Sequence, residues 1–212
     1  VQTPGEALCG EAWKESVAGA LALLEKECGA RIDRVGLAAP GLAAKDGRSI
    51  RDMPGRLAGL VGFDWPDFLQ RPVPVLNDAH AALLGEVWCG AAAGTRDCFM
   101  LTLGTGVGGA AMCDGRLLTG HRGRAGHLGH ISLNPDGWPD IVSTPGSLED
   151  AIGNHSVAAR TGGRFTMTRD LLAAVNEGDS GAQAVWLASV RALAAAIASL
   201  INVLDPEKVI LG

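Results

Sequence analysis

The chain has 212 residues, of which 47% are hydrophobic and 19% charged, and a formal net charge of −5 at pH 7. Such a chain can bury a sizeable core, so it is not intrinsically disordered, and its length suits one large domain or two small ones. The negative charge and the lack of a basic run argue against a nucleic-acid surface, which needs clustered Lys and Arg. We therefore expect a small-molecule partner and no nucleic acid.

The five scattered cysteines indicate buried free thiols in a reducing compartment rather than a disulfide framework. No uninterrupted apolar run reaches the roughly 18 residues of a membrane span, and no signal-peptide pattern opens the chain. A cytoplasmic protein with no membrane partner is expected. The chain begins at Val1 without a methionine and stops directly after a predicted strand, so we expect both ends to be truncated.

The first half of the chain is predicted to alternate helices and strands, since periodic apolar residues are separated by Gly and Pro signals. In chain order the predicted elements are a helix that begins at Thr3-Pro4-Gly5-Glu6 and stops at Gly29, a strand over 32–39 ending in the Pro40-Gly41 turn, a surface hairpin and loop over 45–65, a short helix over 66–70, a buried strand over 73–76, and a helix over 79–89 opened by Asn77-Asp78.

The second half continues this alternation after the small residues of 90–95, which set the predicted domain limits at 1–94 and 95–212. The pattern indicates an α/β protein of two lobes. The predicted elements are strands over 97–103 and 107–113, a type I′ turn at Asp114-Gly115, a loop over 119–130, a strand over 130–133, a turn over 134–137, helices that begin at Ser147, Thr168 and Ser180, and a final strand over 208–211.

A glycine-rich loop joins the strands predicted over 97–103 and 107–113. Such a loop lets backbone N–H groups converge on a ligand that comes close, and phosphate suits it. A hairpin whose tight turn needs positive φ explains the same glycines equally well. The residues concerned are Gly104, Thr105, Gly106, Gly108 and Gly109.

Two carboxylates stand at predicted helix starts. Asp78 or its neighbour Asn77 is expected to cap the helix, and the carboxylate of Asp78 is also able to take a proton from a hydroxyl that attacks phosphorus. Glu149 lies in a first helical turn, where the helix macrodipole favours a carboxylate whatever its function. Capping and catalysis do not exclude each other.

Three histidines and two arginines crowd the glycine-rich loop over 119–130. A metal site is one interpretation, but the loop has no nearby cysteine and the carboxylates lie farther along the chain. Polar recognition of a small ligand fits this composition better. The residues are His121, Arg122, Arg124, His127 and His130.

Taken together, four motifs resemble the ROK family of sugar kinases in order and spacing, from about Val35 to Gly212. The resemblance implies a two-lobed actin-like (ribonuclease H-like) ATPase fold, incomplete at both ends, that transfers the γ-phosphoryl group of ATP to a hexose. The motifs are Asn77-Asp-Ala-His-Ala-Ala-Leu-Leu-Gly-Glu86, Leu103-Gly-Thr-Gly-Val-Gly-Gly-Ala110, Gly123-Arg-Ala-Gly-His-Leu-Gly-His130 and Pro145-Gly-Ser-Leu-Glu149.

The resemblance also implies roles for individual residues, with ATP and Mg²⁺ as cofactors and a homodimer as the assembly. Asp78 would be the general base for the 6-hydroxyl of the sugar. The loop from Gly104 to Gly109 would hold the transferred phosphate. The substrate ligands would be Gly41, Asn77, His127, His130 and Glu149.

Several positions depart from the family pattern. His127 stands where a Glu is usual, and an imidazole cannot accept two hydroxyl hydrogen bonds as a carboxylate does. His80 replaces a usual Asn. Asp140, Val142 and Ser147 occupy positions where many members have zinc-binding cysteines. We therefore expect no structural zinc of that type, and a loop held by Pro139, Pro145 and packing.

Three hypotheses follow. The first is an ATP- and Mg²⁺-dependent hexose kinase of glucokinase type, with Asp78 as the base. The second is a sugar-sensing transcriptional regulator of the same family. The third is a metal-dependent enzyme built on His121, His127 and His130.

Overall fold

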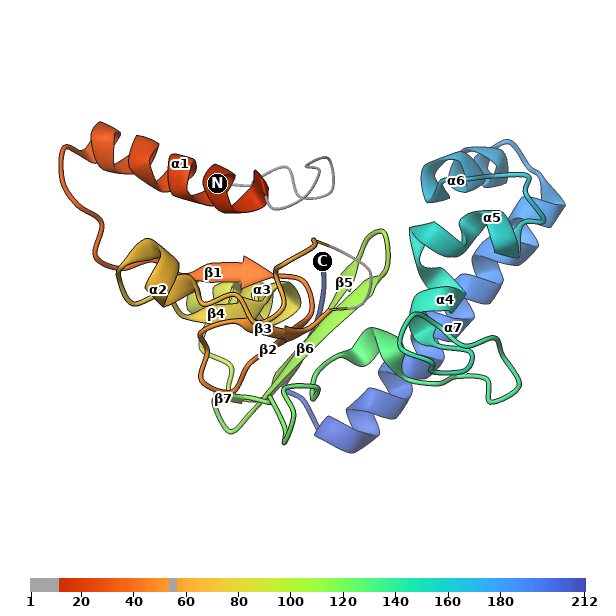
Figure 1. Cartoon of the computed structure of the whole chain (residues 1–212). Coiled ribbons are helices and arrows are strands. Elements are labelled where there is room, and N and C mark those ends of the chain that lie inside the picture. Colours follow the sequence, from red (N-terminus) through yellow and green to blue (C-terminus); the bar gives the residue numbers. More distant parts are fainter. Residues whose placement is uncertain (1–11, 54–56) are drawn as a thin grey trace. The chain divides into compact units, whose positions relative to one another are not determined.

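The computed structural model describes residues 12–53 and 57–212, and Figure 1 traces the order of its elements. The helix start predicted at Thr3-Pro4 lies outside the described residues. The helix that follows ends at Cys28, as predicted, because Gly29 adopts φ 64° and stops it.

The chain forms two compact units. The limits expected from the sequence, 1–94 and 95–212, place the division later along the chain and remain a prediction. The first unit is Val1–Ala81 with Gly120–Arg124, and the second is Ala82–Thr119 with Ala125–Gly212.

The first unit contains α1 (Ala12–Cys28), β1 (Leu37–Ala39), β2 (Leu42–Ala43), β3 (Ile50–Asp52), α2 (Trp65–Leu69), β4 (Val75–Asn77) and the start of α3 (Asp78–Cys89). β1 and β4 pair in parallel with Ala39 opposite Asn77, and β2 pairs antiparallel with β3. Trp13 packs against Phe63 and Trp65 at ring-centroid distances of 5.2 and 5.3 Å. This aromatic core supports the end of β4, where Asn77 and the start of α3 lie.

The second unit contains the rest of α3, then β5 (Cys98–Leu103), β6 (Val107–Cys113), β7 (Arg116–Leu117), the 3-10 turn η1 (Leu128–His130), α4 (Leu148–Ile152), the 3-10 turn η2 (Asn154–Ser156), α5 (Val157–Arg160), α6 (Thr168–Asn176), α7 (Ser180–Leu204) and β8 (Lys208–Leu211). Its sheet has the order β7-β6-β5-β8, with β5 and β6 antiparallel and β5 and β8 parallel. Phe99 and Leu101 of β5 pack in one core cluster with Ala196 and Leu200 of α7. The β5–β6 hairpin is thereby packed against α7.

Several predicted elements differ from the observed ones. The strand expected over 130–133 is wrong: residues 128–130 form η1, and only Ser132 makes an isolated bridge, to Ser147. The long helix α7 is capped by Asp179, whose Oδ1 accepts from the Ala182 N–H at 2.8 Å, and not by Ser180. The strand over 32–39 is confined to its last three residues.

Burial corrects two further expectations, and α6 begins where it was predicted. The segment 45–65 is not only surface loop, since Ile50, Leu60 and Trp65 are almost fully buried in the first unit. The cysteines are free but mostly exposed, and Cys98 is the one buried thiol among the four that the structure describes. Thr168 begins α6 without a side-chain capping bond.

By length and composition alone, the helix α7 is long and apolar enough to cross a membrane. The sequence did not indicate this, because polar residues interrupt the apolar run of α7. A mostly buried core helix passes the same test, but only 17% of the apolar window of α7 is buried in this structure. One face of α7 packs against the core of the second unit through Leu193, Ile197, Leu200 and Leu204.

Candidate active site

Asn77 joins the end of β4 to the start of α3. Its Oδ1 accepts from the N–H groups of Ala79 at 2.9 Å and His80 at 3.2 Å, so the buried Asn77 side chain caps the helix. Its Nδ2 donates to the Gly41 carbonyl at 3.0 Å. Asp78, the first residue of α3, is exposed, and its Oδ1 accepts from the adjacent Ala79 N–H at 2.9 Å. Because Asn77 caps the helix, the second carboxylate oxygen of Asp78, Oδ2, is left to accept a hydrogen bond or a proton from another group.

Gly41 can be no other residue in this turn. Its φ is 97°, and an added Cβ would lie 2.6 Å from the Asp52 carbonyl oxygen and 2.8 Å from the Met53 Cβ. The turn after β1 therefore stays tight, and the bond from Asn77 fixes its carbonyl.

The tip of the β5–β6 hairpin has four consecutive backbone N–H groups, from Gly104 to Val107. The first and the last of them are bonded within the protein. The Gly104 N–H donates to the Gly106 carbonyl at 3.0 Å, and the Val107 N–H donates to Glu149 Oε2 at 2.9 Å. In contrast, the N–H groups of Thr105 and Gly106 donate to no acceptor among the residues that the structure describes. Two adjacent free amides at an exposed loop suit an anion such as phosphate.

The carbonyl groups of this tip are held by η2. The Asn154 N–H donates to the Gly104 carbonyl at 3.1 Å, and the His155 N–H donates to the Thr105 carbonyl at 2.9 Å. Because a trans peptide is planar, each carbonyl that faces η2 turns the following N–H to the opposite side. The free amides of Thr105 and Gly106 therefore point away from η2.

None of the glycines at 104, 106, 108 and 109 has positive φ, and two of them, Gly106 and Gly109, allow a close approach that a side chain would prevent, whereas a Cβ on Gly104 would meet nothing within 4 Å. A Cβ on Gly106 would lie 2.2 Å from Glu149 Oε2, and one on Gly109 would lie 2.6 Å from the Leu128 Cβ. Gly108 pairs with Thr102 in the ladder. The alternative of a hairpin turn that needs positive φ is therefore wrong.

His130 is oriented by Asp140, a residue that the sequence indicated only as the replacement for a zinc ligand. His130 Nδ1 lies 2.8 Å from Asp140 Oδ2, and Asp140 Oδ1 accepts from the Val142 and Thr144 N–H groups at 2.9 and 2.8 Å. Because an ionised carboxylate only accepts, Nδ1 carries the proton and Nε2 of His130 is left as an acceptor.

The pKa of Asp140 follows from these contacts. Burial alone would raise it, but hydrogen bonds from the Thr144 N–H, His130, the Val142 N–H and Ser147 outweigh burial and hold the pKa of Asp140 below its ordinary value. The 134–146 loop is thus fixed by a carboxylate, in addition to the Pro139–Pro145 bridge between the prolines expected to hold it.

The predicted site residues are divided between the two units of the chain. Gly41, Asn77 and Asp78 belong to the first unit, whereas the glycine loop, His127, His130 and Glu149 belong to the second. Within the second unit Glu149 contacts the loop through Val107, and half-buried His127 directly precedes η1.

Of the three histidines considered for a metal site, His121 belongs to the first unit, and His127 and His130 belong to the second. Across 12–53 and 57–212, no group of three or more His, Cys, Asp or Glu side chains is arranged to hold a metal ion.

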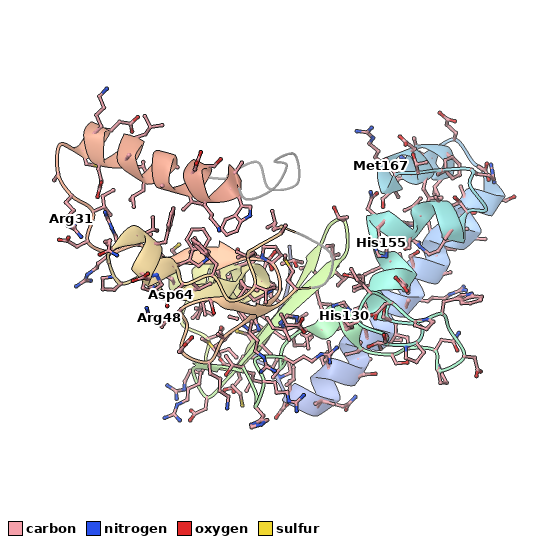
Figure 2. All side chains as sticks on the ribbon, in the orientation of Figure 1. Arg31, Arg48, Asp64, His130, His155 and Met167 are labelled. Atoms are coloured by element: carbon pink, nitrogen blue, oxygen red, sulfur yellow. The ribbon has the colours of Figure 1, made fainter. Side chains whose placement is uncertain are left out.

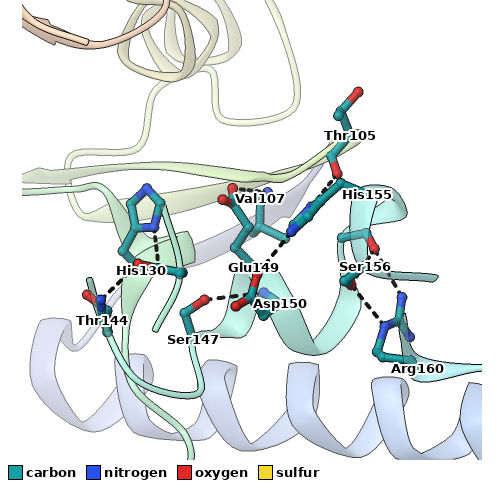
Figure 3. A network of polar contacts seen from close by, with 12 residues as sticks. Thr105, Val107, His130, Thr144, Ser147, Glu149, Asp150, His155, Ser156 and Arg160 are labelled. Carbon is teal, nitrogen blue, oxygen red and sulfur yellow. Dashed lines mark hydrogen bonds and ion pairs between the residues drawn. The ribbon is translucent and has the colours of Figure 1, made fainter. Parts of the chain in front are cut away.

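Sequence reasoning missed the roles of two residues, Asp140 and His155. Each bonds a partner through a contact made only in the fold: His155 Nδ1 reaches the Thr105 carbonyl, 50 residues away, and its Nε2 reaches Asp150. Figure 3 shows His155 between Thr105 and Asp150. The bond to Thr105 joins distant parts of the sequence, so no local pattern could have indicated it.

Comparison with known proteins places the chain. The family model described as ROK family matches residues 2–212. The chain belongs to the ROK family. The α/β, actin-like fold class predicted from the motifs is confirmed by the ROK hexokinase from Thermus thermophilus, which is 34% identical with a TM-score of 0.85. That comparison covers 100% of this chain and 72% of the hexokinase.

Other ROK proteins give the same picture. A ROK family glucokinase from Streptomyces griseus, solved with glucose and AMPPNP, is 26% identical with a TM-score of 0.76, covering 95% of this chain and 71% of that one. The glucokinase of Halalkalibacterium halodurans is 32% identical over 205 residues, covering 84% of this chain. The match spans only 60% of that glucokinase's length.

Proposed function

We propose that this ROK protein transfers the γ-phosphoryl group of ATP to the 6-hydroxyl of a hexose such as glucose. The observation that carries the proposal is the pair of free, adjacent amides of Thr105 and Gly106 at the hairpin tip, held from behind by η2. Phosphoryl transfer asks a protein mainly for positioning and for donors to the phosphate oxygens. The Streptomyces griseus glucokinase, which binds glucose and AMPPNP, supports the choice of ligands.

Each residue then has a defined task. When bound, ATP with Mg²⁺ supplies the phosphoryl group and neutralises its charge. Asp78 accepts the proton of the sugar hydroxyl, and Asn77 with Gly41 binds the sugar beside it. The Thr105 and Gly106 amides donate to phosphate oxygens. His127 binds a sugar hydroxyl, as do Nε2 of His130 and the Oε1 oxygen of Glu149.

Magnesium needs no dedicated protein cage in this scheme. Mg²⁺ keeps several waters and is usually held by substrate phosphates with one or two carboxylates.

Coupled ADP release with ATP, Mg²⁺ and a panel of glucose, mannose, fructose and their N-acetylamino relatives tests the proposal. Asp78→Asn should lower kcat by about 10²- to 10⁴-fold, since it removes the base but leaves the Asn77 cap intact. Asp67→Asn is the matched control, because Asp67 also lies in a first helical turn of the first unit. Residual turnover within tenfold of the unmodified protein would refute the role of Asp78.

The regulator alternative predicts a different result from the same samples. It gives saturable sugar binding by calorimetry without ADP release from any sugar of the panel. The expected homodimer is checked separately by light scattering.

A further inference from the structure

His155 occupies a position between the hairpin tip and α4. Its Nδ1 lies 2.9 Å from the Thr105 carbonyl, which the backbone N–H of His155 also reaches, and its Nε2 lies 2.9 Å from Asp150 Oδ1 (Figure 3). The neighbouring Gly153 gives the ring its room, since a Cβ there would lie 2.8 Å from Nδ1. His155 therefore joins the tip to the first turn of α4.

Both ring nitrogens face groups that only accept hydrogen bonds. A backbone carbonyl has no proton to give, and neither has an ionised carboxylate, so both contacts are satisfied together only by the doubly protonated imidazolium. The charged groups that face the ring are Asp150 and Glu149, both from α4. Burial alone would lower the pKa of His155, but the bonds to Thr105 and Asp150 and the charge of Glu149 raise it above its ordinary value.

We infer that His155, as an imidazolium paired with Asp150, is a positioning residue that holds the Thr105 carbonyl and thereby aims the Gly106 amide at the transferred phosphate. The inference rests on the proposed function of the hairpin tip. His155 does not touch substrate, because both its nitrogens bond within the protein.

The mechanism of this positioning is the geometry of the peptide group. The Thr105 carbonyl and the Gly106 N–H belong to one planar trans peptide, so fixing one fixes the direction of the other. Neutral imidazole has one proton for two acceptors. One of the two contacts then sets a lone pair against a lone pair, and the hold on the tip weakens.

Three variants test the inference. His155→Ala removes both bonds and should raise the KM for ATP about tenfold, the loss expected of a charged hydrogen bond, with sugar affinity by calorimetry unchanged. His155→Asn keeps a neutral donor near the Nδ1 position and should recover part of that loss. Asp150→Asn should raise the KM for ATP, whereas Asp170→Asn, in the first turn of α6, is the matched control and should not.

The pH profile separates positioning from general structural damage. Between about pH 6 and about pH 9, the KM for ATP of the unmodified protein should rise as His155 loses its proton, and that of His155→Asn should stay flat. A flat profile in the unmodified protein, or an unchanged KM for ATP in His155→Ala, would overturn the inference while leaving the kinase proposal intact.

Two readouts do not depend on turnover. Nitrogen-15 NMR should show both nitrogens of His155 protonated at neutral pH, and AMPPNP should shift the Thr105 and Gly106 amide signals more strongly in the unmodified protein than in His155→Ala. If these results hold but no sugar yields ADP, the kinase proposal fails, and what stands is that His155 holds the Thr105 carbonyl and orients the Gly106 amide toward a bound nucleotide. Neutral imidazole signals at neutral pH would overturn it.

Discussion

Replacement of Asp140 by Asn is the sharpest test of how the 134–146 loop is built. The side chain of Asp140 is fully buried, and its two oxygens serve the Val142 N–H, the Thr144 N–H and His130 Nδ1. Asn has the same shape and keeps one acceptor for the two backbone groups. The NH₂ group of Asn, however, would face the protonated Nδ1 of His130, so that two hydrogen-bond donors would oppose each other.

The size of the effect follows from the bonds. A hydrogen bond to a charged group contributes about 1.5–3 kcal/mol and a neutral one about 0.5–1.5 kcal/mol. Making the acceptor neutral therefore costs about 1 kcal/mol for each of the Val142 and Thr144 bonds. We expect Asp140→Asn to lower the free energy of unfolding by about 2 kcal/mol near neutral pH.

The loss should depend on pH. The pKa of Asp140 is lower in the folded protein than its ordinary value, so its contribution to stability is complete above the unfolded pKa of about 3.9 and disappears as the pH falls through the folded pKa. The difference between the unmodified protein and Asp140→Asn should therefore shrink below about pH 4.

Sugar affinity should change as well. To accept from the side-chain amide that Asp140→Asn introduces, His130 must move its proton to Nε2, which then donates instead of accepting. Urea unfolding and sugar calorimetry check both effects, with Asp136→Asn, an exposed carboxylate of the same loop, as control. Equal stability of Asp140→Asn and Asp136→Asn at neutral pH would refute the reasoning.

Two further predictions concern packing in the second unit. Gly129→Ala should lower the melting temperature sharply and the free energy of unfolding by about 3 kcal/mol or more, because the new Cβ would lie 1.7 Å from the Val107 carbonyl oxygen. The control is Gly19→Ala in α1 of the first unit, where a Cβ meets nothing within 4 Å, and it should raise the free energy of unfolding by up to about 1 kcal/mol. A Gly129→Ala protein as stable as the parent would contradict the observed approach. Arg160→Lys should lose about 1–2 kcal/mol in urea unfolding, since an ammonium cannot reproduce the guanidinium fork, and an unchanged midpoint would show that the fork contributes nothing. The acceptors of that fork are Ser156 Oγ, Ser189 Oγ and the Gly153 carbonyl.

Local signals predicted the elements that local physics decides. The strand over 107–113 is confirmed at both ends, and Asp114 and Gly115 adopt φ 49° and 72°, as a type I′ turn requires. Asp205, just before Pro206, is the C-cap of α7. In each case the deciding residues are neighbours in the sequence.

The prediction failed where a distant segment decides the backbone. Gly129 lies so close to the Val107 carbonyl of β6 that no side chain fits there, and the chain forms η1 just before the segment predicted as a strand. The approach of Val107 to Glu149 spans 42 residues and joins the glycine loop to α4. The residue types of the candidate site could be read from the motifs, but the groups that orient them could not.

Two carboxylate–imidazole pairs in the second unit illustrate this difference. His130 lies on the green segment and His155 on the teal one in Figure 2. Asp140 occupies only Nδ1 of His130, so Nε2 remains free to accept a hydroxyl from a ligand.

In His155 both nitrogens are committed, one to the Thr105 carbonyl and one to Asp150. On the proposed function, the same pair of side chains would serve recognition in His130 and positioning in His155, according to what the second ring nitrogen contacts. The two pairs therefore lead to different predictions. Substitution of Asp140 should change sugar affinity through His130, whereas substitution of Asp150 should leave sugar affinity unchanged and raise only the KM for ATP.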